Sequence, residues 1–170
     1  MPAPGHGSGP LAALTAVFVV AGDQATKLLI RSEIARGDER DLILGARLVH
    51  VRNDGVAFGQ FGGNGLLVGL VVTAALLGLL AYFVLHRDTP LIWLPTGLLL
   101  GGAIGNLIDR IAAGAVTDFI KLPHWPAFNV ADIAVTCGVV ALLVVVELDA
   151  RRAGRAVSGG GQADGAHSRG

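Results

Sequence analysis

Four long apolar stretches alternate with shorter polar connections along this chain. The stretches cover residues 11–30, 66–85, 91–108 and 130–148. At about 1.5 Å of rise per residue, a helix over each stretch spans roughly the 30 Å hydrocarbon core of a bilayer. The pattern therefore predicts an all-α membrane protein with four transmembrane helices. The first stretch lacks a preceding basic segment and contains Asp23 and Lys27, so we expect it to be retained rather than cleaved as a signal peptide.

The connections add detail to this picture. Residues 46–52 alternate in polarity and are followed by a turn at 53–55, which predicts a small β-containing loop region between the first two helices. The connection at 87–90 is so short that the second and third helices should be antiparallel neighbours. Glycines recur at every fourth position in the third helix, at Gly97, Gly101 and Gly105, and we expect them to allow close helix packing.

Domain organisation follows from composition. Residues 1–10 are rich in Pro and Gly, and residues 151–170 are rich in Gly and Ala with scattered charge, so both ends are expected to be disordered. One four-helix membrane domain is predicted over residues 11–150. The chain of 170 residues is 52% hydrophobic and only 15% charged, as expected for a polytopic membrane protein.

Charge and cysteine content exclude several classes of function. The net charge is zero and no basic cluster is interleaved with aromatic residues, so a nucleic-acid partner is not expected. The single cysteine, Cys137, lies in an apolar run and is expected to be buried by packing. The five histidines are dispersed, so no metal or other cofactor is expected.

Polar residues inside or beside the apolar stretches are expected to meet at one membrane surface, because alternate ends of consecutive spans lie on the same side. They lie at the end of the first span, in the following loop, at the end of the third span, and around the start of the fourth: Asp23, Lys27, Asn53, Asn106, Asp109, Arg110, Asp118, Asn129 and Asp132. The sequence therefore predicts one polar site at the water interface.

Aspartates suggest the chemistry of that site. A carboxylate at the bilayer centre costs roughly 2.5 kcal/mol or more, so its presence requires a reason. Asp109 has a basic neighbour in Arg110, whereas Asp118 and Asp132 have only Lys121 within four residues. Two carboxylates in one poorly solvated site share a proton, which supplies an acid and a base for activating water on a peptide carbonyl. From the residues alone, Asp109 could replace Asp118 in this pair.

Five short blocks of this sequence resemble lipoprotein signal peptidase, the bacterial type II signal peptidase. They occur in the order found in that family, at residues 23–27, 53–58, 101–110, 114–119 and 128–132. The resemblance implies a membrane aspartyl endopeptidase that cuts a diacylglyceryl-modified prolipoprotein on the amino side of the lipidated cysteine. It further implies cytoplasmic termini, a site at the outer face of the cytoplasmic membrane, an extracytoplasmic loop after the first helix, and a monomer whose partners are its substrate and membrane lipid.

The resemblance also assigns roles to residues. Asp118 and Asp132 correspond to the catalytic dyad. Asparagines and an arginine are implied to orient substrate and dyad: Asn53, Asn106, Asn129 and Arg110. Further supporting positions are Asp23, Lys27, Asp109, Gly55 and Ala131.

Other interpretations of the sequence remain open. Intramembrane acids also occur in small transporters and proton pathways, although these would be expected to spread through the membrane depth. A non-catalytic scaffold would need only the glycine-lined packing. Trp125 is interpreted as an interfacial anchor rather than a substrate contact. Seven Lys and Arg residues lie on the side of the predicted site against five on the other, so charge counting alone would place the termini outside.

Overall fold

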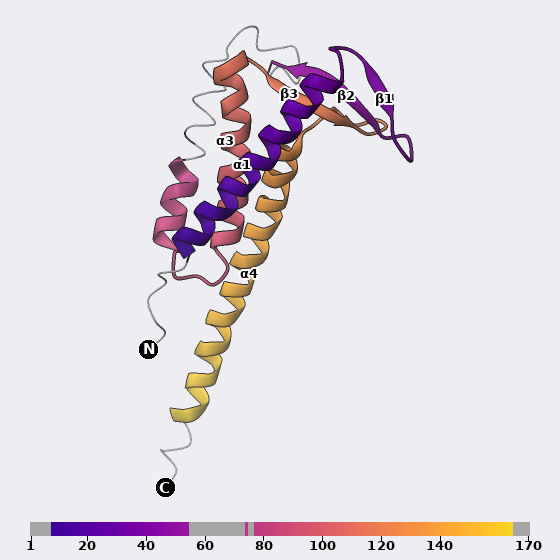
Figure 1. Cartoon of the computed structure of the whole chain (residues 1–170). Helices are drawn as coiled ribbons and strands as arrows, with labels where there is room; N and C mark the ends of the chain where they lie inside the picture. The colour runs from indigo at the N-terminus through magenta and orange to yellow at the C-terminus, as the bar shows by residue number, and fades with distance from the viewer. Residues whose placement is uncertain (1–7, 55–73, 75–76, 165–170) are drawn as a thin grey trace.

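Three long helices, a shorter helical segment at residues 77–85 and a small sheet make up the described part of the protein (Figure 1). The computed structural model describes residues 8–54, 74 and 77–164. The helices are α1 (Ser8–Glu33), α3 (Trp93–Ala113) and α4 (Val130–Asp164), and α3 contacts both of the others. The sheet projects to one side at the end of the helices where α1 finishes and α4 begins. The start of α4, the end of α1 and the sheet thus meet in one region.

The helices agree in part with the four spans predicted from the sequence. Among the described residues, two helices are long and apolar enough to cross a membrane, α1 and the portion of α4 from Val130 to Arg152. The third predicted helix is present as α3 and extends to Ala113. Of the predicted helix at 66–85, residues 74 and 77–85 are helical, and the others lie outside the described residues.

The ends of the chain are more helical than their composition suggested. α1 begins at Ser8, within the segment expected to be disordered, and α4 continues to Asp164 rather than ending near residue 150. Arg151 donates a hydrogen bond to Glu147 one turn earlier, at 2.6 Å, which supports the helix beyond its apolar part. The structure therefore differs from the expected boundaries at both ends.

The sheet has three antiparallel strands in the order β1-β2-β3. They are β1 (Glu39–Asp41), β2 (Arg47–Asn53) and β3 (Val116–Lys121). β2 confirms the strand predicted at 46–52. The strands β1 and β2 lie in the loop after α1, as expected, and the sheet also includes β3, which follows α3 and pairs with β2 along its length. β3 is buried at four consecutive positions, so it lacks the polarity alternation by which β2 was recognised.

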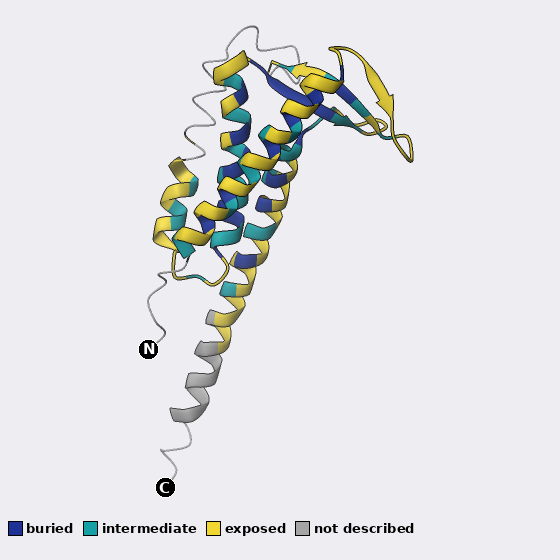
Figure 2. Ribbon diagram, in the orientation of Figure 1, coloured by how far each residue is buried: buried dark blue, intermediate teal, exposed yellow. Residues whose placement is uncertain are grey.

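Glycines allow α3 to lie very close to its two neighbours, and the buried faces of the helices point toward one another (Figure 2). A Cβ atom on Gly101 would lie 2.9 Å from the Ala16 carbonyl oxygen of α1, and one on Gly102 would lie 2.5 Å from the Ala131 carbonyl oxygen of α4. The packing role predicted for the glycines of this helix is thus confirmed. α3 ends at Ala113, and the next residue, Gly114, has a φ of 71° and provides the left-handed cap that turns the chain into β3.

The expectation that Cys137 is buried is wrong, because its side chain is exposed. α4 is apolar around most of its circumference, so its sequence has too little periodicity to show which face packs against α3. Large apolar side chains also remain exposed on α1 and α4, among them Phe18 at 81% and Leu143 at 66%. Such extensive apolar exposure is typical of a surface that contacts lipid.

Replacing Gly101 by alanine should lower the thermal unfolding midpoint of the detergent-solubilised protein. The added methyl group meets backbone on α1, so the helices must separate, at a cost of about 1–3 kcal/mol. Gly22→Ala is the matched control, because a Cβ there has no neighbouring atom within 4 Å. Equal midpoints for the two variants would show that α1 and α3 are not packed as described.

Candidate active site

The two aspartates predicted as a dyad come from different elements that meet at the end of the helices. Asp118 lies in the middle of β3 and is only 2% exposed. Asp132 lies in the first turn of α4 and is half-buried. The fold therefore brings together two carboxylates from positions fourteen residues apart, one deeply buried and one more accessible.

Asn129 connects these two carboxylates. Its side-chain Nδ2 donates to Asp118 Oδ1 at 2.7 Å, and its backbone N–H donates to Asp132 Oδ2 at 3.1 Å. Its side-chain Oδ1 accepts a hydrogen bond from the backbone N–H of Asp132 at 3.0 Å. One fully buried asparagine thus fixes the positions of both carboxyl groups.

The hydrogen bonds between Asn129 and Asp132 form a capping box at the start of α4. In this motif the residue before the helix and the third helical residue each accept a hydrogen bond from the other's backbone N–H. The positive end of the helix dipole also favours a negative charge in the first turn. The Asp132 carboxyl group is therefore held in place by the start of its own helix.

Two further asparagines complete the hydrogen bonding of the pair. Asn53, at the end of β2, donates to Asp118 Oδ2 at 2.9 Å. Asn106, on α3, donates to Asp132 Oδ1 at 2.8 Å, and its own Oδ1 accepts from Asn129 Nδ2 at 3.1 Å. Each oxygen of the two carboxyl groups thus accepts a hydrogen bond from an asparagine, which fixes the rotation of both groups.

Beneath the pair lies a fully buried lysine. Lys27 Nζ is 2.7 Å from Asp23 Oδ2, 3.3 Å from Asp109 Oδ2 and 3.0 Å from Asn106 Oδ1. An ammonium group has three hydrogens to donate, so these three neighbours satisfy it. Lys27 links α1 to α3 and, through Asn106, to Asp132.

The two aspartates around Lys27 each hold the backbone next to a dyad position. Asp23 Oδ1 accepts from the backbone N–H of Ala131 at 3.0 Å, immediately before Asp132. Asp109 Oδ2 accepts from the backbone N–H of Thr117 at 2.9 Å, immediately before Asp118. The buried ion pairs therefore fix the backbone on which the two predicted catalytic side chains are carried.

Arg31 and Gln24 also contact this network, and neither was identified from the sequence. Arg31 Nη2 donates to Asp109 Oδ1 at 2.9 Å and to Thr117 Oγ1 at 2.8 Å. Gln24 Nε2 donates to Asp23 Oδ2 at 3.1 Å. Arg31 lies four residues after Lys27, and this i, i+4 spacing was the signal that could have shown it on the same helical face.

Arg110, expected to orient substrate or dyad, contacts the site only indirectly among the described residues. Its Nη1 lies 3.4 Å from the backbone carbonyl oxygen of Asn106, one turn earlier in α3. Local neutralisation of Asp109 by Arg110 is not seen, since Lys27 and Arg31 are its ion-pair partners. Gly55 lies outside the described residues. Within the described part of the chain, no group of three or more His, Cys, Asp and Glu side chains is arranged to hold a metal ion.

Burial raises the pKa of Asp118 from its ordinary value of 3.8 to about 6. The hydrogen bonds from Asn53 and Asn129 oppose this rise, and the negative charge of Asp132 adds to it. Asp118 is thus suited to keep a proton under conditions where an exposed aspartate is ionised. The two carboxyl groups of the predicted dyad thus have distinct environments.

Comparison with known proteins places this geometry in context. Residues 15–148 match the model of the family Signal peptidase (SPase) II. The lipoprotein signal peptidase of Moorella thermoacetica is 41% identical over 145 residues, covering 84% of this chain and 96% of the relative. That of Syntrophomonas wolfei is 40% identical over 137 residues, covering 80% of this chain and 92% of the relative.

A solved structure of a bacterial membrane enzyme is similar in fold. It superposes with a TM-score of 0.72 at 32% sequence identity, covering 79% of this chain and 91% of the other.

Replacing Lys27 by methionine should destabilise the protein by roughly 3–5 kcal/mol, because Asp23 and Asp109 would lose a buried counter-charge. Thermal unfolding in detergent would measure the effect. Lys121→Met is the control: this half-exposed lysine is 4.0 Å from its partner Glu39, and such pairs contribute about 1 kcal/mol or less. Similar losses for both variants would contradict the described role of Lys27.

The raised pKa of Asp118 predicts how stability depends on pH. The folded state binds a proton at Asp118 more tightly than the unfolded state does, so the contribution of this group to stability is fully present below pH 3.8 and is lost as pH rises through about 6. The shift corresponds to about 3 kcal/mol in total. We expect the unfolding midpoint of Asp118→Asn to depend less on pH over this range than that of the wild type or of the exposed Asp41→Asn. Parallel pH profiles for all three proteins would contradict the assignment.

Proposed function

The chain belongs to the signal peptidase II family of aspartic endopeptidases, and we propose that Asp118 and Asp132 are the dyad with which it removes signal peptides from prolipoproteins. The observation that supports this assignment best is the bridging position of Asn129, which hydrogen-bonds to both residues. Asp109, the alternative left open by the sequence, is paired with Lys27 and Arg31 and carries the Thr117 backbone. A carboxylate neutralised in this way supports the site rather than acting on water.

The environments of the two carboxyl groups suggest their roles. Asp132 is the base: it takes a proton from water as the water oxygen attacks the scissile carbonyl carbon. Asp118 is the acid and gives its proton to the carbonyl oxygen. As the tetrahedral intermediate collapses, the proton on Asp132 passes to the leaving nitrogen, the C–N bond breaks, and Asp118 regains its proton from the diol. The products are a carboxylic acid on the signal peptide and a free amine on the cysteine.

The surrounding asparagines keep the two carboxyl groups in position for this reaction. Asn53 and Asn106 each hold one oxygen of a carboxyl group and Asn129 holds the other oxygen of both groups, so the two carboxyl groups keep a fixed orientation. Holding reacting groups in place removes part of the entropic cost of the reaction. Gly55 and Arg110 are proposed as substrate-facing support by resemblance to the family.

The membrane arrangement is part of the same proposal. The helices form four transmembrane spans with cytoplasmic termini, and the sheet and dyad lie at the outer face of the cytoplasmic membrane. A diacylglyceryl-cysteine leaves the bilayer only at a cost of about 0.8 kcal/mol per buried CH₂, so the substrate enters laterally between helices. The exposed apolar surfaces of α1 and α4 are suited to contact its acyl chains. The enzyme is proposed to act as a monomer.

Cleavage of a diacylglyceryl-modified prolipoprotein by the purified protein in nanodiscs tests the dyad. Asp118→Asn and Asp132→Asn should each lower the rate by roughly a thousandfold or more, because each removes an essential acid or base. A metal chelator should leave the wild-type rate unchanged. Product formation is followed by the change in size on a gel.

Two variants make this experiment specific. Asp41→Asn removes an exposed aspartate from β1 and should cleave like the wild type. Asp109→Asn should lose stability while its folded fraction retains measurable cleavage. An active Asp118→Asn beside a folded, inactive Asp109→Asn would transfer the acid role to Asp109. Absence of cleavage by the wild type would favour a transport function instead.

A further inference from the structure

A cavity of about 420 Å³ lies behind the sheet, at the end of α1. Its volume is far larger than the roughly 30 Å³ that a water molecule occupies in the liquid. Four of the side chains that line it are basic: Arg31, Arg36, His50 and Arg52. The others include Ile34 and Ala115, which are almost fully buried, and none of the described residues that line the cavity is acidic.

This cavity is on the opposite face of the sheet from the dyad. Successive side chains of a strand point to opposite faces, and residues directly paired across two strands share a face. Arg52 pairs with Thr117, which places both on the cavity side, whereas Val51 pairs with Asp118. The cavity therefore does not belong to the cleavage site, although β3 forms a wall of both.

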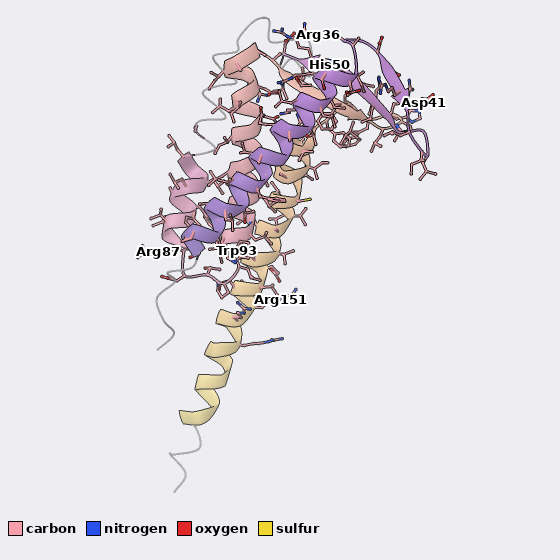
Figure 3. All side chains as sticks on the ribbon, in the orientation of Figure 1. Arg36, Asp41, His50, Arg87, Trp93 and Arg151 are labelled. Atoms are coloured by element: carbon pink, nitrogen blue, oxygen red, sulfur yellow. The ribbon has the colours of Figure 1, made fainter. Side chains whose placement is uncertain are left out.

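The basic side chains of the cavity differ in whether a nearby carboxylate already neutralises their charge. Arg31 is held by Asp109 and Thr117 through Nε and Nη2. Arg52 forms an ion pair with Asp54, whose side chain is 60% exposed. Water weakens this pair, so the charge of Arg52 is only partly neutralised. Arg36 has no ion-pair or hydrogen-bond partner among the described residues, and Figure 3 shows it beside the end of α1 near His50. The His50 ring is fixed by its Nδ1, which donates to the Ile34 carbonyl oxygen at 2.7 Å.

The number of arginines in this region is itself unusual. Residues 31–52 contain five, on the side that the proposed topology places outside, where basic residues are normally less frequent. Arg47 pairs with Glu39, and Arg40 donates to the Glu33 carbonyl oxygen, so these two have local structural roles. The other three line the cavity. A common anionic ligand would explain why they are gathered there.

We propose that this cavity binds the phosphate group of an anionic phospholipid from the outer leaflet. Guanidinium groups are well suited to phosphate oxygens because they donate two parallel hydrogen bonds. The cavity lies at the end of a helix long enough to cross a membrane, the level at which headgroups lie. Arg31 connects the ligand to Asp109 and to the backbone before Asp118, so a bound headgroup would steady the strand that carries the acid.

Lipid binding to the full-length protein in detergent tests this proposal without reference to cleavage. Native mass spectrometry would count bound phosphatidylglycerol on the wild type, on the double variant Arg36→Gln/Arg52→Gln, and on the matched double variant Arg40→Gln/Arg47→Gln. We expect about tenfold weaker binding by the first variant only, since it loses charge-assisted hydrogen bonds to phosphate. Diacylglycerol with the same acyl chains should bind all three proteins equally.

Two results would overturn the proposal. Equal binding of phosphatidylglycerol by the two double variants would show that the cavity arginines do not hold the headgroup. Inorganic phosphate that raises the unfolding midpoint of the wild type as much as the lipid does would identify a free anion as the ligand. Arg36→Gln alone guards against misfolding of the double variant: it removes an exposed side chain, should fold normally, and should still show weakened lipid binding.

Discussion

The buried ammonium group of Lys27 is the interaction on which the site depends. It neutralises Asp23 and Asp109 in a place with no access to water, and these carboxylates can then accept hydrogen bonds from the backbone of α4 and β3. A buried pair of charges contributes little net stability, because desolvation offsets most of the attraction. Its role here is geometric. Through Asp23 and Asp109, one positive charge on α1 fixes the positions of α3, α4 and β3, which are distant in sequence.

The same hydrogen bonds that cap the start of α4 also arrange the proposed catalytic groups. Asn129 caps α4 as asparagines commonly cap helices, and Asp132 occupies the position where a capping box needs a carboxylate. The same asparagine side chain reaches Asp118 on the neighbouring strand. The residues that begin this helix thus also position the proposed base, so the local folding signal and the proposed catalytic geometry depend on the same side chains.

Much of this arrangement was predictable from sequence, and its limits have physical causes. Apolar length predicted α1, α3 and α4, and the alternation of spans placed the polar residues at one surface. β3 was missed because it is buried on both faces, and Cys137 was placed wrongly because an evenly apolar helix does not show which face packs. The ion-pair partners of the buried aspartates were the hardest feature to predict from the sequence. The nearest basic residue in sequence to Asp109 is Arg110, whereas its ion-pair partners in the structure come from α1.

The order of the elements along the chain has a consequence for biosynthesis. The proposed acid lies on β3 and the proposed base on α4, the last of the described helices. During synthesis, a chain whose α4 has not yet been made and packed against α3 has only the first of these two carboxyl groups in place. If Asp118 and Asp132 form the dyad as proposed, the protein gains the ability to hydrolyse peptide bonds only when α4 has docked against the rest of the chain.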